Sequence, residues 1–196
     1  MDSADRGDKF ATLDSVKVAR VLLLLVALLA GCAKDNRHVL LISTADQHML
    51  VLRDSIKIAE YPVSTSKFGV GDAPNSNATP IGLLRVRKKI GRNAPAGAVL
   101  KSRRLTGEIL PANAPGRDPI VTRILWLEGL EAQNENAYDR YIYIHGTPEE
   151  RNIGLAASYG CIRMRSNDVI TLYDIVGVGA KVLIVTKPFK RAEQIH

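Results

Sequence analysis

Cysteine and aromatic residues are scarce in this chain of 196 residues. Its two cysteines cannot form the dense disulfide framework of a small secreted domain, and they lack the paired spacing of a zinc site. The four histidines include no helical pair that would complete a metal site, so we expect no metal and no organic cofactor. Aromatic residues make up only 5% of the chain, which argues against a platform that stacks the bases of single-stranded nucleic acid.

Internal repeats, heptads and low-complexity tracts are also absent from the sequence. Hydrophobic residues make up 46% and charged residues 24% of the chain. This composition is typical of a globular protein and argues against a disordered or collagen-like chain. The length allows one domain of common size with short tails.

No apolar run is long enough to cross a membrane comfortably. Val21–Ala30 reads VLLLLVALLA and would cover ~15 Å as a helix, about half of a bilayer core. Lys17 and Arg20 precede this run, and the sequence Leu29-Ala30-Gly31-Cys32 follows it. The order of charge, apolar run and small residues is typical of a secretory signal. The alternative is a cytosolic protein with an apolar N-terminal helix.

The small residues before Cys32 resemble the lipobox of bacterial lipoproteins. This resemblance implies that residues 1–31 are a signal peptide, that cleavage precedes Cys32, and that its thiol carries a diacylglycerol. Residues 32–37 would then be a tether, and two or three acyl chains would anchor the protein firmly to the membrane. By the same resemblance, Ala33 after the cysteine implies the periplasmic face of the outer membrane in Gram-negative sorting.

Short runs rich in β-branched residues, separated by turn residues, predict a β-dominated body. The expected strands are Val39–Thr44, His48–Leu52, Ser55–Val63, Leu83–Ile90, Ile120–Leu127, Arg140–His145 and Lys181–Thr186. Residues 67–80 are predicted to be a loop because they are rich in Gly, Pro and Asn. Residues 91–119 contain four Pro and four Gly, which predicts a long irregular connection.

One α-helix is expected, late in the chain. Ser166 is a good N-cap, Asp168 suits the positive N-terminal end, and Gly177 is expected to end the helix. The apolar residues that share one helical face are Val169, Ile170, Tyr173 and Val176. We therefore predict one domain over residues 38–186, in which this helix packs on a sheet, followed by a tail at 187–196.

Two residues that suit nucleophilic catalysis lie 16 residues apart. His145 ends an alternating strand, and Cys161 follows a glycine that permits a tight turn. An imidazole can take the proton of a thiol, and the resulting thiolate attacks a carbonyl to give a thioester. If Cys32 is lipidated, Cys161 is the single remaining thiol, and lone thiols in oxidising compartments are usually avoided or used. The alternative is a buried small residue and a hydrogen-bonded core histidine.

The sequence around these two residues is similar to a known family signature. The tripeptide His145-Gly146-Thr147, followed by the run SYGCIRM at residues 158–164, resembles the signature of the L,D-transpeptidase catalytic domain, also called the YkuD domain. Residues 58–65 (IAEYPVST) and 79–82 (TPIG) resemble upstream elements of the family, and residues 167–184 resemble its closing helix and strand. The resemblance covers roughly residues 38–186. It implies a mixed-sheet β-sandwich and a cysteine acyl transfer on peptidoglycan stem peptides.

The resemblance also implies roles for individual residues. Cys161 would be the nucleophile, His145 its general base, and Gly146 the backbone carbonyl that orients the imidazole. The Gly160 and Cys161 amides would form the oxyanion hole, with Tyr159 as a further donor. Ser158 would order the turn, and Arg163 would lie beside the thiol and help to place the acidic donor stem. The family often has His where this chain has Tyr159, and a tyrosine is a poor base at neutral pH. Ser158 and Tyr159 could instead be structural, and Arg163 a surface or sheet-pairing arginine.

A basic stretch without acidic residues spans residues 85–104. Its cationic residues are Arg85, Arg87, Lys88, Lys89, Arg92, Lys101, Arg103 and Arg104. It could attract the carboxylates of peptidoglycan stems, and a solvated face is the alternative. The export signal argues against a nucleic-acid partner.

These observations favour a lipid-anchored L,D-transpeptidase that forms a thioester with a tetrapeptide stem. The amine acceptor would be a second stem or a partner protein. The alternatives are a hydrolase of the same fold that acts as an L,D-carboxypeptidase or amidase, a non-catalytic lipoprotein that tethers the wall, and a cytosolic nucleic-acid binder.

Overall fold

The computed structural model describes residues 34–189, so the predicted signal peptide and Cys32 lie outside the described residues. This part of the chain holds ten strands, one α-helix and two 3₁₀ helices. The elements are β1 (His38–Ser43), β2 (His48–Arg53), β3 (Ile56–Pro62), β4 (Gly82–Ile90), β5 (Ala98–Lys101), β6 (Arg104–Ile109), β7 (Val121–Gly129), η1 (Ala132–Ala137), β8 (Tyr143–Gly146), η2 (Glu150–Asn152), β9 (Ile162–Met164), α2 (Ser166–Ile175) and β10 (Lys181–Val185).

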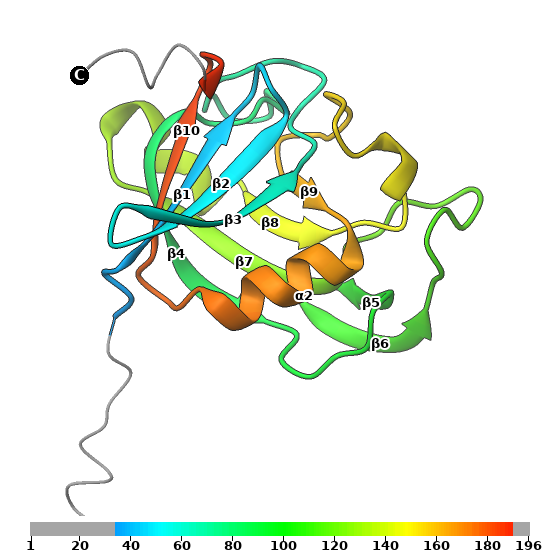
Figure 1. Cartoon of the computed structure of the whole chain (residues 1–196). Helices are drawn as coiled ribbons and strands as arrows, with labels where there is room; N and C mark the ends of the chain where they lie inside the picture. Colours follow the sequence, from blue (N-terminus) through cyan, green and yellow to red (C-terminus); the bar gives the residue numbers. More distant parts are fainter. Residues whose placement is uncertain (1–33, 190–196) are drawn as a thin grey trace, which may run out of the picture. The chain divides into compact units, whose positions relative to one another are not determined.

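The strands form a mixed sheet in the order β3-β2-β1-β10-β4-β7-β5-β6, and β8 pairs with β7 and β9 with β8 (Figure 1). Two pairs are parallel, β1 with β10 and β8 with β9, and the other pairs are antiparallel. The pairing of β1 with β10 joins the two ends of the described chain. The predicted β-dominated fold with a mixed sheet is confirmed, and α2 is the single α-helix within residues 34–189.

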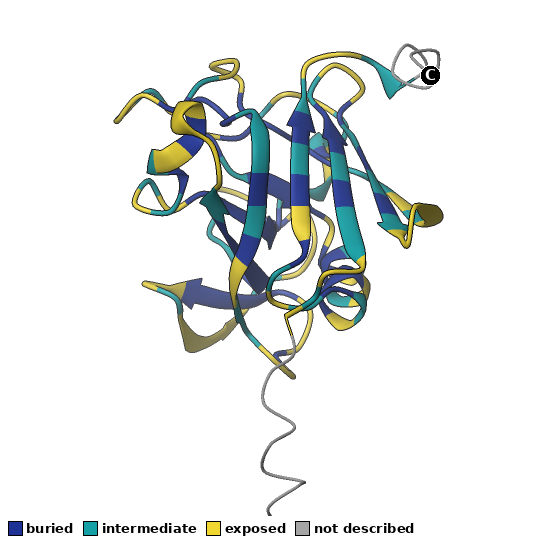
Figure 2. Cartoon of the chain, turned by 90° about the vertical axis from the view of Figure 1, so that its left-hand side faces the viewer, coloured by how far each residue is buried: buried dark blue, intermediate teal, exposed yellow. Residues whose placement is uncertain are grey.

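The main core lies between the two halves of this sheet and α2. Buried residues alternate with less buried ones along β2 and β10, and Figure 2 shows this alternation on several strands, because successive side chains point to opposite faces. Leu40 of β1 and Leu84 of β4 share the core with Leu125 of β7 and Ile162 of β9. Full burial of each such side chain stabilises the fold by about 1.5–3 kcal/mol. The core therefore fixes β8 and β9, which carry the predicted site, to the rest of the sheet.

The predicted irregular connection at residues 91–119 is wrong over part of its length. It contains the hairpin of β5 and β6, whose turn is formed by Ser102 (φ 49°) and Arg103 (φ 66°). Two successive left-handed residues match the twist of a tight hairpin, which usually contains Asn-Gly. Because Ser-Arg replaces that signal and every residue of β6 is exposed, neither a turn motif nor an apolar alternation marks the hairpin in the sequence.

The predicted strand over residues 140–145 begins later, at Tyr143. Tyr141 has a left-handed backbone (φ 58°), so the chain reverses direction before β8 starts. The short strand β9 was not predicted, because three residues are too few to show alternation.

The helix α2 begins one residue earlier than the predicted Ser166 N-cap requires, because Ser166 is already its first helical residue. Arg165 occupies the N-cap position without a capping side chain, and the Ser166 N–H donates to Glu150 Oε1 at 2.8 Å. The Glu150 carboxylate, 16 residues earlier in the sequence, thus accepts from an N–H group at the start of the helix, as a local N-cap side chain would. The buried face is Val169, Leu172, Tyr173 and Val176, whereas the expected Ile170 is only half-buried. Ile175 is the last helical residue and Val176 is the C-cap, so the helix ends just before Gly177.

Candidate active site

Cys161 lies in a tight turn immediately before β9. Gly160 has φ 115°, a conformation that strains any residue with a Cβ. Ser158 Oγ accepts from the Gly160 N–H at 3.2 Å and donates to the Cys161 carbonyl oxygen at 2.6 Å. Thr79 Oγ1 donates to the Gly160 carbonyl oxygen at 3.0 Å. These bonds hold the cysteine backbone in one conformation.

The segment 64–66 holds the other side of this turn. Ser64 and Arg163 exchange both backbone hydrogen bonds, at 3.0 and 2.9 Å. The Thr65 carbonyl oxygen accepts from the Ser158 N–H at 2.9 Å. The upstream run that resembled the family is therefore in direct contact with the cysteine turn, although about 95 residues separate them in the sequence.

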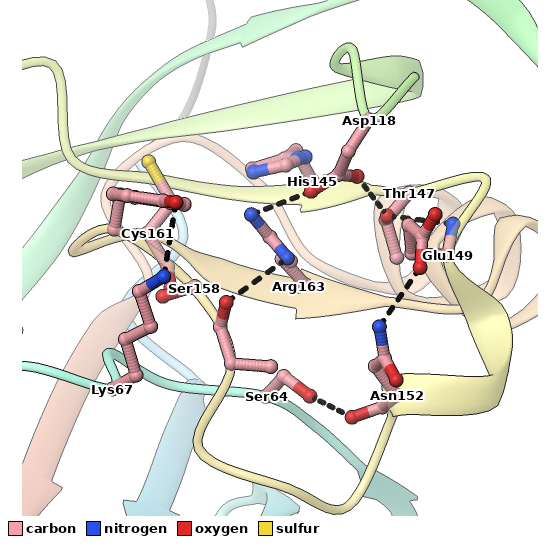
Figure 3. Close-up of polar contacts among 12 residues, drawn as sticks. Ser64, Lys67, Asp118, His145, Thr147, Glu149, Asn152, Ser158, Cys161 and Arg163 are labelled. Atoms are coloured by element: carbon pink, nitrogen blue, oxygen red, sulfur yellow. Dashed lines mark hydrogen bonds and ion pairs between the residues drawn. The ribbon is translucent and has the colours of Figure 1, made fainter. Parts of the chain in front are cut away.

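His145 lies on β8, which is parallel and adjacent to β9. Ile144 is opposite Ile162, so His145 lies on the strand next to the one that begins just after Cys161, and Figure 3 shows the two residues in the same part of the site. His145 Nδ1 lies 2.8 Å from the Gly146 carbonyl oxygen. A carbonyl can only accept, so Nδ1 carries the hydrogen and Nε2 has a free lone pair. Burial lowers the pKa of His145 to about 4, and the neutral imidazole is the form present at pH 7.

The Cys161 side chain is partly exposed and lines a cavity of about 380 Å³. Its Sγ donates to the Tyr141 carbonyl oxygen at 3.4 Å. Desolvation raises the pKa of the thiol to about 11, and the Tyr143 N–H and the Arg163 charge lower it by less. The resting site therefore holds a neutral thiol and a neutral imidazole.

The strained backbone of Tyr141 positions the carbonyl oxygen that accepts the hydrogen bond of the Cys161 thiol. A left-handed conformation at such a residue costs about 1–3 kcal/mol and persists only where the surroundings impose it. In the described structure the hydrogen bond of the thiol is made with this carbonyl oxygen.

Arg163 occupies a different environment from the one expected. Its side chain is buried, and its guanidinium forms an ion pair with Asp118 at 2.6 Å and donates to the Ala157 carbonyl oxygen at 3.3 Å (Figure 3). Asp118 also accepts from Thr147 Oγ1 at 2.6 Å. Arg163 does not line the cavity, so the expectation that it places an acidic stem is corrected. It is a sheet-pairing arginine whose charge lies behind the thiol and the imidazole.

The predicted oxyanion donors differ in availability. The Gly160 N–H already donates to Ser158, whereas within residues 34–189 the N–H groups of Tyr159 and Cys161 form no hydrogen bond. These two amides therefore have a donor available to a ligand. This part of the prediction is corrected for Gly160, whose amide is used by the turn itself.

Tyr159 forms the exposed rim of the cavity. Its side chain contacts Phe68, and its hydroxyl accepts from Lys67 Nζ at 3.0 Å. That ammonium group lowers the pKa of the Tyr159 hydroxyl. The sequence did not point to Lys67, Asp118 or Tyr141, because each acquires its neighbours only through the tertiary fold.

The described residues provide neither a cluster of metal ligands nor a helix that could cross a membrane. Residues 34–189 contain no cluster of three or more His, Cys, Asp or Glu side chains that could hold a metal ion. Nor does any helix in this part of the chain have the length and apolarity needed to cross a membrane.

Comparison with known proteins decides the family. The family model of the L,D-transpeptidase catalytic domain, YkuD, matches residues 37–184. This chain belongs to the L,D-transpeptidase catalytic domain family. The match includes the cysteine turn, the histidine strand and the 64–66 segment, so the site described above lies within the L,D-transpeptidase domain.

Several curated proteins are similar in sequence to this L,D-transpeptidase domain. The probable L,D-transpeptidase YbiS of Escherichia coli K12 is 29% identical over 162 residues, which is 79% of this chain and 49% of that protein. The probable L,D-transpeptidase YcfS of Escherichia coli K12 is 30% identical over 136 residues, 68% of this chain and 39% of that protein. The chain thus spans about half or less of the length of these relatives.

Solved structures of L,D-transpeptidases share the fold. An L,D-transpeptidase from Mycobacterium smegmatis matches with a TM-score of 0.52 and 19% identity, covering 76% of this chain and 59% of that one. L,D-transpeptidase 3 from Mycobacterium tuberculosis, in complex with a faropenem-derived adduct, matches with a TM-score of 0.50 and 17% identity over 77% of this chain and 60% of that one.

Proposed function

We propose that this L,D-transpeptidase domain is a cysteine acyltransferase that acts on peptidoglycan stem peptides. The observation that carries the proposal is that His145 lies on β8 and Cys161 immediately precedes the adjacent parallel strand β9, while Nδ1 of the imidazole donates to the Gly146 carbonyl oxygen and Nε2 is able to accept a proton. Because both groups are neutral at rest, proton transfer accompanies attack and does not precede it.

The acylation step begins when Cys161 Sγ attacks the carbonyl carbon of the diaminopimelate residue in a tetrapeptide stem. The thiol proton passes to His145 Nε2 as the S–C bond forms. The N–H groups of Cys161 and Tyr159 stabilise the negative oxygen of the tetrahedral intermediate. The C–N bond to the terminal D-Ala then breaks, and its nitrogen takes the proton from His145. The product is a thioester on Cys161.

The transfer step reverses these movements with a new amine. The amine of a second stem, or of a partner protein, attacks the thioester carbonyl and gives a proton to His145. The C–S bond breaks, and the thiolate takes this proton back. With water in place of the amine, the same residues would carry out hydrolysis as an L,D-carboxypeptidase or amidase.

The test of acylation uses a carbapenem, which traps an active thiol as a covalent adduct. We expect intact-mass analysis to show one adduct on the wild type and on Cys32→Ala, and none on Cys161→Ala. An unmodified wild type would contradict the proposal. Analysis of stem products with purified tetrapeptide stems then separates crosslinks from trimmed tripeptides, and so separates the transferase from the hydrolase.

The proposal includes a membrane anchor that rests on the sequence alone. A lipid on Cys32 would hold the domain at the periplasmic face of the outer membrane. Metabolic labelling with palmitate should mark the wild type and not Cys32→Ala. Equal labelling of the two, or no labelling of the wild type, would contradict the anchor without affecting the acyltransferase proposal.

A further inference from the structure

The cavity beside Cys161 carries a carboxylate that has no partner in the described structure. Asp139 is exposed and lines the same cavity of about 380 Å³ as Cys161. Within residues 34–189, neither an ion pair nor a hydrogen bond involves its side chain. In a chain with a net charge of +7, an unneutralised carboxylate next to the nucleophile is available to a ligand.

The neighbouring cation of the cavity wall is already neutralised. Arg140 forms a buried ion pair with Asp72 at 2.6 Å, and its guanidinium also donates to the carbonyl oxygens of Gly71 at 3.1 Å and Ala78 at 2.7 Å. The guanidinium thus uses its charge and its N–H donors on groups of the protein itself. Among the lining residues, Asp139 therefore carries the charge that the described structure does not neutralise, and the Lys67 ammonium lies at the rim, 3.0 Å from the Tyr159 hydroxyl.

The rest of the wall suits a peptide with a positive group. Asn75 and Asn77 hold left-handed turns in the loop over the cavity (φ 62° and 54°), and Tyr141 and Tyr159 provide aromatic surface. Amide groups satisfy the polar atoms of a peptide, and the faces of tyrosine rings attract cations. Neither kind of group would compensate for the charge of a ligand carboxylate placed beside Asp139.

The opposite charge lies on the other side of Tyr141. A groove of about 530 Å³ between β4 and the β5–β6 hairpin is lined by Lys88, Arg103 and Arg104. The Arg103 guanidinium of the groove lies 5.0 Å from the centre of the ring of Tyr141, which lines the cavity of Asp139, so the cationic groove and the cavity are neighbours. The part of a substrate that carries carboxylates should bind in the cationic groove. The part that carries an amine should bind in the cavity.

We propose that Asp139 is a specificity-determining residue that binds the ammonium group of the amine substrate in the cavity beside Cys161. The inference rests on the proposed acyltransferase function, since only transfer requires an amine. The ammonium loses one proton to water before it attacks, and its nitrogen then gives a second proton to His145 as the C–N bond forms and the C–S bond breaks. Asp139 thus concentrates the amine near the thioester without exchanging protons itself.

The binding test compares two small probes of the same shape. Nα-acetyl-lysine amide carries a side-chain ammonium and no carboxylate, whereas Nα-acetyl-norleucine amide lacks the ammonium. In NMR titrations of the wild type, we expect the lysine probe to bind more tightly by about fivefold, the effect of one solvent-accessible ion pair. Asp139→Asn should remove this preference and leave the norleucine affinity unchanged. Glu135→Gln, which removes an exposed charge on η1 outside the cavity lining, should retain the preference.

A second measurement separates this inference from the proposed function. Thiol acylation by a carbapenem should go to completion in both the wild type and Asp139→Asn, whereas transfer of a stem acyl group to the lysine probe should require about fivefold more probe in the variant. Absence of acylation in the wild type would contradict the acyltransferase and leave the binding result to be judged alone. Equal binding of the two probes to the wild type, or an unchanged preference in Asp139→Asn, would overturn the role of Asp139.

Discussion

The thiol of Cys161 should react slowly with iodoacetamide at neutral pH and faster as the pH rises. The perturbation is pH itself, applied to the Cys32→Ser variant so that Cys161 is the single cysteine. Burial raises the pKa of this thiol to about 11, and only the thiolate is the nucleophile. An active-site cysteine that already existed as a thiolate–imidazolium pair would behave oppositely, with a rate that is constant from weakly acidic to weakly alkaline pH.

The expected alkylation rate of Cys161 depends on two quantities, the fraction of thiolate present and the intrinsic reactivity of that thiolate. At pH 7 an ordinary cysteine with a pKa of ~8.5 is ~3% ionised, whereas a pKa of about 11 leaves about one thiolate in 10⁴. A more basic thiolate is ~10–18-fold more nucleophilic, because reactivity rises by ~0.4–0.5 log units per pKa unit. The two effects combine to a rate roughly 20-fold below that of an unperturbed cysteine at the same pH.

The assay is alkylation followed by intact mass between pH 6 and 10.5, with N-acetylcysteine as the reference thiol. We expect the protein rate to rise about tenfold per pH unit without a plateau below pH 10, whereas the reference levels off above its own pKa. Replacement of the base, His145→Gln, should leave this profile nearly unchanged while it abolishes acylation by a substrate. A plateau at acidic pH that disappears in His145→Gln would refute the neutral resting pair.

Three further predictions concern the scaffold of the site. Asp72→Asn leaves the buried Arg140 guanidinium without its counter-charge, and urea unfolding should show a loss of about 3–5 kcal/mol. Gly129→Ala places a methyl group 1.9 Å from the backbone oxygen of Asn134, so the same assay should show a loss of at least 1–3 kcal/mol, as overpacking does. Glu150→Ala removes the acceptor for the Ser166 N–H, and a loss of about 1 kcal/mol is expected, while the far-UV circular dichroism of the folded protein stays the same.

The local elements could be predicted where one periodic pattern dominates. Residues 38–43 and 48–53 show alternating burial across a short turn, and α2 buries side chains at helical spacing, so the sequence alone predicts both kinds of element. The hairpin of β5 and β6 could not be predicted, because all residues of β6 are exposed and packing contributes no pattern.

The residues of the candidate site also fall into those that the sequence could predict and those that it could not. The spacing of His145 and Cys161 left a buried cysteine and a core histidine as the alternative, and the resemblance to the L,D-transpeptidase signature was needed to predict a nucleophile and its base. The partners of Arg163 could not be named, because Asp118 lies in an irregular connection whose only signal in the sequence is its content of Pro and Gly. An arginine that forms a buried ion pair and one that faces a ligand look the same in a sequence.

The amino-acid order by itself determined the β-dominated class, the closing helix, and the chemistry that a thiol and an imidazole could perform. These depend on side-chain type and short spacing, which chain geometry converts directly into local structure. Only the tertiary structure decided that the thiol is neutral at rest, that the Gly160 amide is occupied, and that Asp139 and Cys161 line the same cavity. Those properties depend on solvent exclusion and on atoms brought together from distant parts of the chain.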